Sequence, residues 1–103
     1  MKKFRFRLES VYSYRQLCEH WAKEALLAAK LASIEAESVL DRIREHRSSL
    51  LREPTLSLDD RRTLELALEA IDADERGQMV VLTLLRQEEE KALEEWKSKR
   101  TEL

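Results

Sequence analysis

The sequence predicts an all-α protein in which two long helices form an antiparallel coiled-coil hairpin. Turn residues are scarce, with one Gly and one Pro in 103 residues, whereas a sheet protein of this length needs several turns. Charged residues make up 39% of the chain and aromatic residues 6%, a composition typical of long helices and coiled coils. A heptad pattern of apolar residues extends along both sides of the single proline, Pro54.

The first expected helix covers about residues 4–52, a stretch without Gly or Pro. Two interleaved columns recur every seven residues, and we assign the first to heptad position d and the second to position a. The first column contains Phe4, Val11, Cys18, Ala25, Ala32, Val39 and His46. The second contains Leu8, Arg15, Ala22, Ala29, Ala36, Ile43 and Leu50. Leu26 and Leu40 fall at position e and widen the apolar stripe.

A turn at about residues 53–57 and a second helix at about 58–103 complete the expected hairpin, which we treat as one domain, residues 1–103. Pro54 disfavours helical geometry at the preceding residue, and Ser57 with Asp60 is close to a capping box. Gly77 interrupts the second helix at a cost of about 1 kcal/mol relative to Ala. The seam of this helix is expected to contain Leu64, Leu68, Ile71, Glu75, Gln78, Leu82, Leu85, Glu89, Ala92, Trp96, Lys99 and Leu103.

Folding the chain about Pro54 predicts which segments face each other. The Ala-rich stretch 22–36 is expected opposite 72–87, so that small side chains meet bulky ones, namely Met79, Val80, Val81, Leu82, Leu84 and Leu85. The same folding is expected to place Phe4, Phe6 and Leu8 beside Trp96 and Leu103, which gives the open end of the hairpin an aromatic and basic character.

Charge and cysteine content narrow the class of protein. A net charge of −2 and a pI near 5.8 argue against a general nucleic-acid binder. The single cysteine, Cys18, excludes an internal disulfide and favours a reducing compartment. We find no apolar run long enough to span a membrane and no apolar segment behind the basic start, so we expect a cytoplasmic protein.

Residues for catalysis or ligand binding are scarce, and we expect neither an enzyme nor a cofactor. His20 and Glu24 are one helical turn apart and could contact a metal from one face, but two ligands make an incomplete site and such pairs are common on exposed helices. Cys18 is interpreted as a small apolar filler of the seam. No Gly-rich loop is present to hold a nucleotide phosphate.

The open end leaves three interpretations for the basic segment 2–7. It can be a frayed terminus in which Phe4 caps the seam. It can bind an acidic socket of a partner protein, with Phe4 and Phe6 as anchors. It can also be a surface on which the bases of single-stranded nucleic acid stack. Trp21 is only partly covered by a two-helix seam, and Tyr12 and Tyr14 lie on the same half. These aromatics favour either a partner or self-association.

The opening residues Phe4-Arg5-Phe6-Arg7-Leu8-Glu9, with Val11, Tyr14 and Arg15, resemble the start of the FliJ family of bacterial flagellar type III export. The later run Ala92-Leu93, Trp96, Lys99 and Leu103 is similar to the family's second helix. The resemblance covers nearly the whole chain and implies an antiparallel coiled coil similar to the central stalk of rotary ATPases. FliJ proteins usually continue well past the tryptophan motif, whereas this sequence stops at Leu103, which points to a shortened chain or a short, divergent member.

The resemblance also implies partners. The open end of FliJ proteins inserts into the ring of the hexameric export ATPase, another face contacts the export gate's membrane protein, and export chaperones bind as well. This implies a position at the flagellar base, peripheral to the cytoplasmic membrane. The open-end residues would be Phe4, Arg5, Phe6, Arg7, Leu8 and Trp96. Ile71 matches an apolar position of the gate-binding face, with Ala67, Asp74 and Gln78 on the same side. Alternatives are a structural self-associating coiled coil, with Trp21 and Leu26 driving dimers, and another type III secretion stalk.

Overall fold

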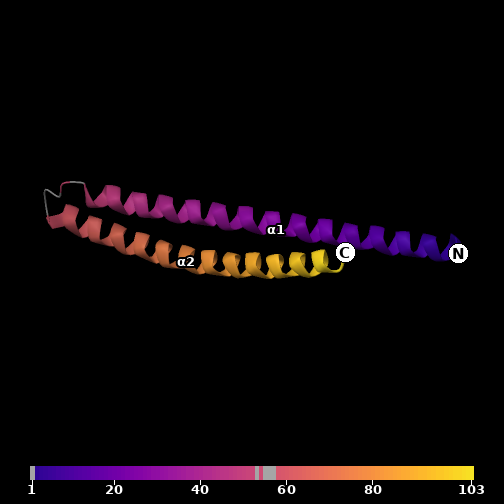
Figure 1. The fold of residues 1–103 in the computed structure, drawn as a ribbon. Helices are drawn as coiled ribbons and strands as arrows, with labels where there is room; N and C mark the ends of the chain where they lie inside the picture. Colours follow the sequence, from indigo (N-terminus) through magenta and orange to yellow (C-terminus); the bar gives the residue numbers. More distant parts are fainter. Residues whose placement is uncertain (1, 53, 55–57) are drawn as a thin grey trace. The chain divides into compact units, whose positions relative to one another are not determined.

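Two antiparallel helices make up the protein in a computed structural model that describes residues 2–52, 54 and 58–103, with side chains from Arg5 onward (Figure 1). Helix α1 covers Lys2–Leu51 and helix α2 covers Leu58–Thr101, close to the expected ranges 4–52 and 58–103. The described residues contain no strand, so the prediction of an all-α hairpin is confirmed. The predicted cap at Ser57 lies outside the described residues.

The ends of α2 carry charges that complement the helix dipole. Asp59 and Asp60 lie in its first turn, and Lys99 and Arg100 lie in its last turn. Acidic groups near a helix N-terminus and basic groups near its C-terminus are favourable because the backbone dipoles add along the axis. The sequence pattern that placed the start of α2 near Leu58 therefore agrees with the electrostatics of the helix.

The hairpin divides into two compact units, a division that the expected single domain did not include. Unit 1 combines Met1–Ala32 with Leu85–Leu103, and unit 2 is Ser33–Leu84. Each unit contains one segment of α1 and one segment of α2, so each is a two-helix layer with a single seam between the segments.

The α1 seam keeps one of the two predicted columns at its centre and moves the other to its margin. Ala22 and Ala36 of the predicted a column are buried, but the second column runs through Leu26 and Leu40, which we had assigned to flanking position e. In the predicted d column, Cys18, Ala32 and Val39 are half-buried, whereas Val11, Ala25 and His46 are exposed. Burying a Leu stabilises a helix pair by about 1.5–3 kcal/mol, far more than burying Ala, so the helix turns its leucines inward.

The α2 seam has the predicted periodicity. Of its predicted members, Ile71 and Leu82 are buried, Leu103 is exposed, and all the others are half-buried. Of the bulky side chains of 72–87, Leu82 is buried and Leu85 is half-buried. The expectation that they would all face α1 is wrong for Met79, Val80, Val81 and Leu84, which are exposed. These residues fall between successive members of the heptad that Ile71 and Leu82 define.

Side-chain contacts set the register of unit 2. Gln78 Nε2 donates a hydrogen bond to the backbone oxygen of Ala36 at 3.0 Å. Arg47 Nη1 lies 3.0 Å from Asp72 Oδ1 and 2.8 Å from Glu75 Oε2, and Arg44 Nε lies 3.1 Å from Glu75 Oε1. The cost of placing the Glu75 carboxylate in the seam is therefore offset, because two guanidinium groups of α1 neutralise its charge.

Candidate functional site

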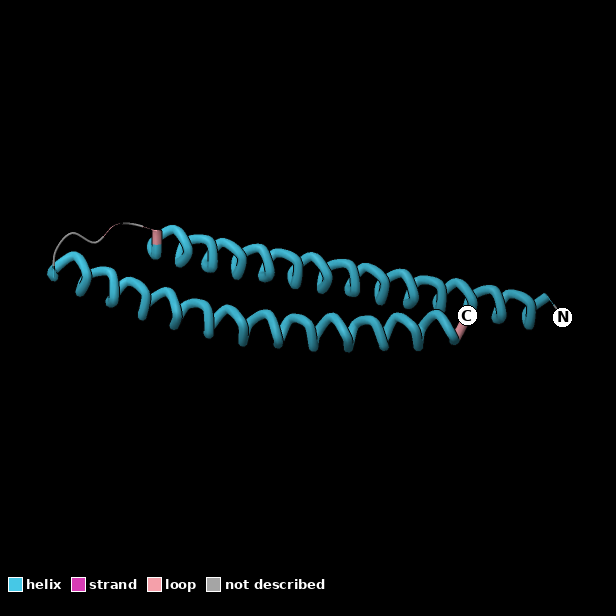
Figure 2. Tube along the Cα trace, turned by 60° about the vertical axis from the view of Figure 1, so that its left-hand side comes forward, coloured by secondary structure: helices cyan, strands magenta, loops and turns pink. Residues whose placement is uncertain are grey.

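The N-terminal part of α1 extends past the end of α2 within unit 1. Arg15 Nη1 donates a hydrogen bond to the backbone oxygen of Glu102 at 3.2 Å, so Arg15 lies level with the last residues of α2. Because the helices are antiparallel, the N-terminal end of α1 runs past the end of α2 (Figures 1 and 2). We call Arg5–Tyr14 the N-terminal arm, which is about 15 Å long at 1.5 Å per residue.

The arm exposes apolar and basic side chains together. Phe6 is 70% exposed and Leu8 is 55% exposed, and Arg5 and Arg7 are exposed beside them. Leu8 lies seven residues before Arg15, and Tyr12 lies seven before Glu19, so both belong to the columns that α2 covers farther along α1. The arm is therefore the continuation of the seam without its cover.

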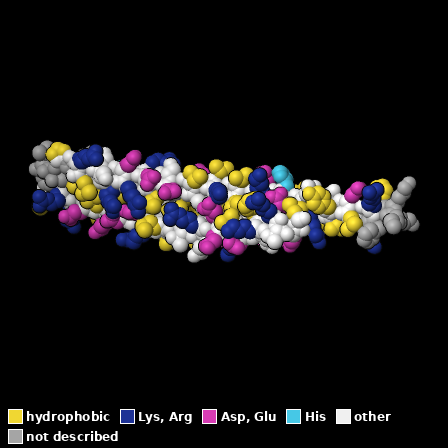
Figure 3. All heavy atoms as spheres, in the orientation of Figure 1, with side chains coloured by type: hydrophobic (Ala, Val, Ile, Leu, Met, Phe, Trp, Pro, Cys, Tyr) yellow, Lys and Arg dark blue, Asp and Glu magenta, His cyan; other side chains and the backbone are white. Residues whose placement is uncertain are grey.

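A second exposed row continues from the arm along α1. Tyr14, Leu17 and Trp21 follow one another at three- and four-residue spacing, and all three are exposed. This spacing puts them on one face of the helix. Tyr14 and Trp21 were recognised from the sequence but Leu17 was not, although the spacing between the two aromatics could have revealed it. Hydrophobic side chains interspersed with basic ones are visible on the surface in Figure 3.

Trp96 does not belong to the arm, and its predicted place beside Phe6 and Leu8 is wrong. Trp96 Nε1 donates a hydrogen bond to Glu19 Oε1 at 2.8 Å, and the Arg100 guanidinium carbon lies 5.4 Å from the Trp96 ring centroid. Glu19 is 13 residues after Phe6, or about 20 Å along α1. Trp96 therefore holds α2 against α1 inside unit 1. The side chain of Phe4 lies outside the described residues.

Ile71 also differs from its predicted role. Its side chain is 7% exposed and faces α1 in unit 2, and Gln78 on the same side is engaged with the Ala36 backbone. A partner could contact Ile71 only by separating the helices, so we remove it from the partner surface. The same correction applies to Leu26, which is 5% exposed and cannot drive dimers. Trp21, at 57% exposure, remains available.

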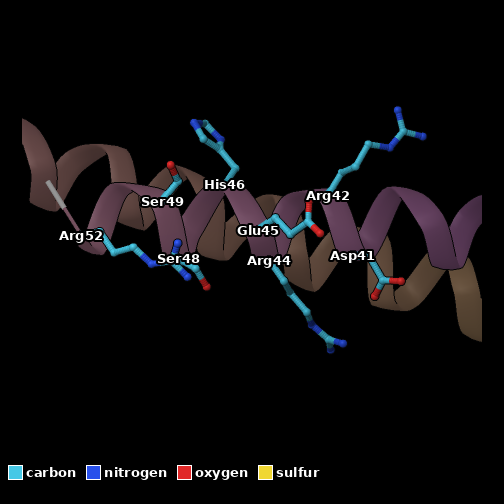
Figure 4. Close-up of a pocket in the computed structure, with 8 residues that line it drawn as sticks. All are labelled: Asp41, Arg42, Arg44, Glu45, His46, Ser48, Ser49 and Arg52. Carbon is cyan, nitrogen blue, oxygen red and sulfur yellow. The ribbon is translucent and has the colours of Figure 1, made fainter.

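A shallow hollow follows the C-terminal part of α1 in unit 2 (Figure 4). In Figure 4, Arg42 and His46 extend to one side of the helix and Arg44 to the opposite side. Arg44 is bound to Glu75, so its charge is already neutralised. The side chains do not converge on a point where a substrate atom could sit, which nucleophilic or acid–base catalysis requires.

The described residues offer no cluster of metal ligands and no helix suited to crossing a membrane. No group of three or more His, Cys, Asp or Glu side chains is arranged there to hold a metal ion, and the His20–Glu24 pair gains no third ligand. Neither helix contains a described stretch apolar and long enough to cross a membrane.

No family model, curated protein or solved structure matches this chain. The described residues define a class in structural terms, a two-helix hairpin whose N-terminal arm exposes apolar and basic residues together.

Proposed function

We propose that this protein is a non-enzymatic helical adaptor that binds a protein partner through its N-terminal arm. The observation that carries the proposal is the uncovered seam of the arm, where Leu8 and Tyr12 lie exposed on the same short segment as the cations Arg5 and Arg7. Burying one such apolar side chain contributes about 1.5–3 kcal/mol, and the exposed arm forgoes this until a partner covers it.

The chemistry of the arm favours an acidic socket with apolar walls. Aromatic and Arg side chains are the commonest anchors of protein interfaces, because they bury a large area or form several hydrogen bonds with little loss of conformational entropy. Arg5 and Arg7 would pair with carboxylates of the socket while Phe6 and Leu8 fill its apolar part. Glu9 is the only acidic residue of the arm.

The resemblance to FliJ proteins supports a particular partner, the ring of the hexameric export ATPase. In this proposal the arm enters the opening of the ring and stimulates the ATPase, at the flagellar base next to the cytoplasmic membrane. Contacts with the export gate's membrane protein and with export chaperones belong to the same proposal. These contacts use exposed residues, since Ile71 is buried.

A charge reversal tests the arm. The double variant Arg5→Glu/Arg7→Glu is expected to reduce binding to the hexameric ATPase at least tenfold, and to reduce its stimulation, while helix content is unchanged. The matched control is Arg42→Glu/Arg61→Glu, which makes the same charge change at exposed positions of unit 2. If both double variants bind equally well, the arm is not the contact. Salt-sensitive binding of the wild-type chain to single-stranded RNA would instead favour a nucleic-acid partner.

A further inference from the structure

Unit 2 carries a second heptad stripe on α2, on the side away from α1. Its members are all exposed and follow at alternating spacings of four and three residues: Leu66, Ala70, Ala73, Gly77, Val80 and Leu84. Leu66 is 62% exposed, Val80 60% and Leu84 56%. The buried residues Ile71 and Leu82 occupy the opposite side of the same helix. We call the six exposed residues the outer stripe.

Gly77 lies near the middle of the stripe. A Cβ added at Gly77 would meet nothing within 4 Å, and its φ is not positive. A Gly inside a helix is unfavourable relative to Ala, so the isolated hairpin would be more stable with a side chain here. The missing side chain instead creates a place where a second helix can approach closely.

The outer stripe is self-complementary about Glu75. An antiparallel copy centred there pairs Leu66 with Leu84, Ala70 with Val80, and Ala73 with Gly77. Large side chains therefore meet at both ends and small ones at the centre, which matches the alternation that interdigitated helices require. We propose that the outer stripe docks a second copy of this chain in a two-fold, antiparallel helix pair. A two-fold interface uses the same patch on both copies, as this stripe does.

The flanks of the stripe supply charge complementarity. Glu69 and Arg76 lie on one flank, and neither forms an ion pair within the described residues. In the two-fold pair, Glu69 of each copy lies about 7 Å along the axis from Arg76 of the other, within reach of these long side chains. The two Arg76 side chains approach each other near the axis, and the two Glu69 carboxylates offset that repulsion from either side. On the opposite flank, Val81 lies near Ala67 of the second copy.

The size of the stripe sets the expected strength. Its six residues and the four flanking residues give ten per copy, at most about half of the roughly 20–30 residues per side in a standard stable interface. The dimer is therefore expected to be reversible, with a dissociation constant in the micromolar range or weaker, and to form when chains are concentrated at a common site. The N-terminal arm takes no part in this contact, so the inference is independent of the proposed function.

Sedimentation equilibrium of the full chain, from about 1 μM to about 1 mM, tests the dimer. The wild type is expected to show a reversible monomer–dimer equilibrium. Gly77→Gln, which fills the close approach without adding charge, is expected to weaken dimerisation at least tenfold with helix content retained. Ser38→Gln, at an exposed position of α1 in the same unit, is the matched control and is expected to dimerise like the wild type. A monomer throughout, or a dimer unaffected by Gly77→Gln, would overturn the proposal.

Cross-linking tests the orientation. In a Cys18→Ser background, chains carrying Leu66→Cys are mixed with chains carrying Leu84→Cys and oxidised. An antiparallel pair is expected to join position 66 of one copy to position 84 of the other. Disulfides between two copies of the Leu66→Cys chain alone would indicate a parallel pair and contradict the two-fold arrangement, because the antiparallel pair separates these positions by about 27 Å. Dimers that cross-link at neither combination would place the interface on another face, such as that of Trp21, and would equally overturn the proposal.

Discussion

Replacing Trp96 by phenylalanine tests the contact that holds the end of α2 against α1 in unit 1. The substitution keeps an aromatic ring under Arg100 but removes the indole N–H that donates to Glu19 at 2.8 Å. The hydrogen bond joins a neutral donor to a carboxylate, and such bonds contribute about 1.5–3 kcal/mol when buried. Because both side chains are only half-buried, water competes for the carboxylate and the expected contribution falls to about 1 kcal/mol.

A double-mutant cycle isolates this contribution from the loss of ring area. Trp96→Phe, Glu19→Ala and the double variant are unfolded by heat and followed by far-UV circular dichroism. We expect a coupling free energy of about 1 kcal/mol between the two sites. The single Trp96→Phe variant is expected to lose about 4–8 °C in Tm for each kcal/mol.

Trp21→Phe is the matched control for the tryptophan substitution. Its indole is 57% exposed, so its effect on the free energy of unfolding is expected to stay below about 0.5 kcal/mol. A Trp96–Glu19 coupling below about 0.3 kcal/mol is within the range of independent sites. That result would refute the view that Trp96 is a structural clamp, and would return it to the list of possible partner contacts.

Three further predictions concern unit 2. Ser33 is 6% exposed, and its Oγ has no hydrogen-bond partner among the described residues. Ser33→Ala is therefore expected to raise the free energy of unfolding, measured in urea, by about 1 kcal/mol more than the control Ser38→Ala does. An equal effect of the two substitutions would show that the Ser33 hydroxyl is satisfied. Gly77→Ala is expected to stabilise the monomer at low concentration by about 1 kcal/mol, and a loss of stability there would mean that Gly77 serves the hairpin itself. Arg47→Met removes the ion-pair partner of Asp72 and leaves Glu75 paired with Arg44 alone. It is expected to lower the free energy of unfolding by about 0.5–1 kcal/mol, and by less in high salt. A loss that does not depend on salt would indicate that Arg47 acts through packing instead.

The helices were predictable because their signals are local. The absence of Gly and Pro from residues 4–52, and the position of Pro54, depend only on backbone chemistry and identify the two helices to within a few residues. The α2 seam was predictable for the same reason, since its apolar residues define one stripe. On α1 two columns competed, and Leu26 and Leu40 decided the outcome because their burial outweighs that of the alanines beside them.

The register of the pair could not be predicted in the same way. Sliding one helix by seven residues keeps every seam position on the seam, so periodicity alone does not distinguish the alternatives. Specific contacts distinguish them, including the bonds from Gln78 to Ala36 and from Trp96 to Glu19. These contacts place Glu19 opposite Trp96, where the prediction had placed the segment around Phe6. The exposed arm therefore followed from the register and not from the composition of the first residues.

The two proposed surfaces lie in different units and differ in chemistry, which makes them separable by experiment. The arm combines cations with aromatic side chains, and its binding should weaken with salt, whereas the outer stripe is mostly apolar and should depend less on salt. Arg5→Glu/Arg7→Glu is expected to weaken binding to the proposed ATPase partner at least tenfold and leave the dimer intact, and Gly77→Gln is expected to do the reverse. Both variants should be measured in both assays, with circular dichroism confirming that helix content is retained. Loss of both activities in either variant would show that the arm and the stripe act as one surface, or that one substitution disturbs the hairpin as a whole.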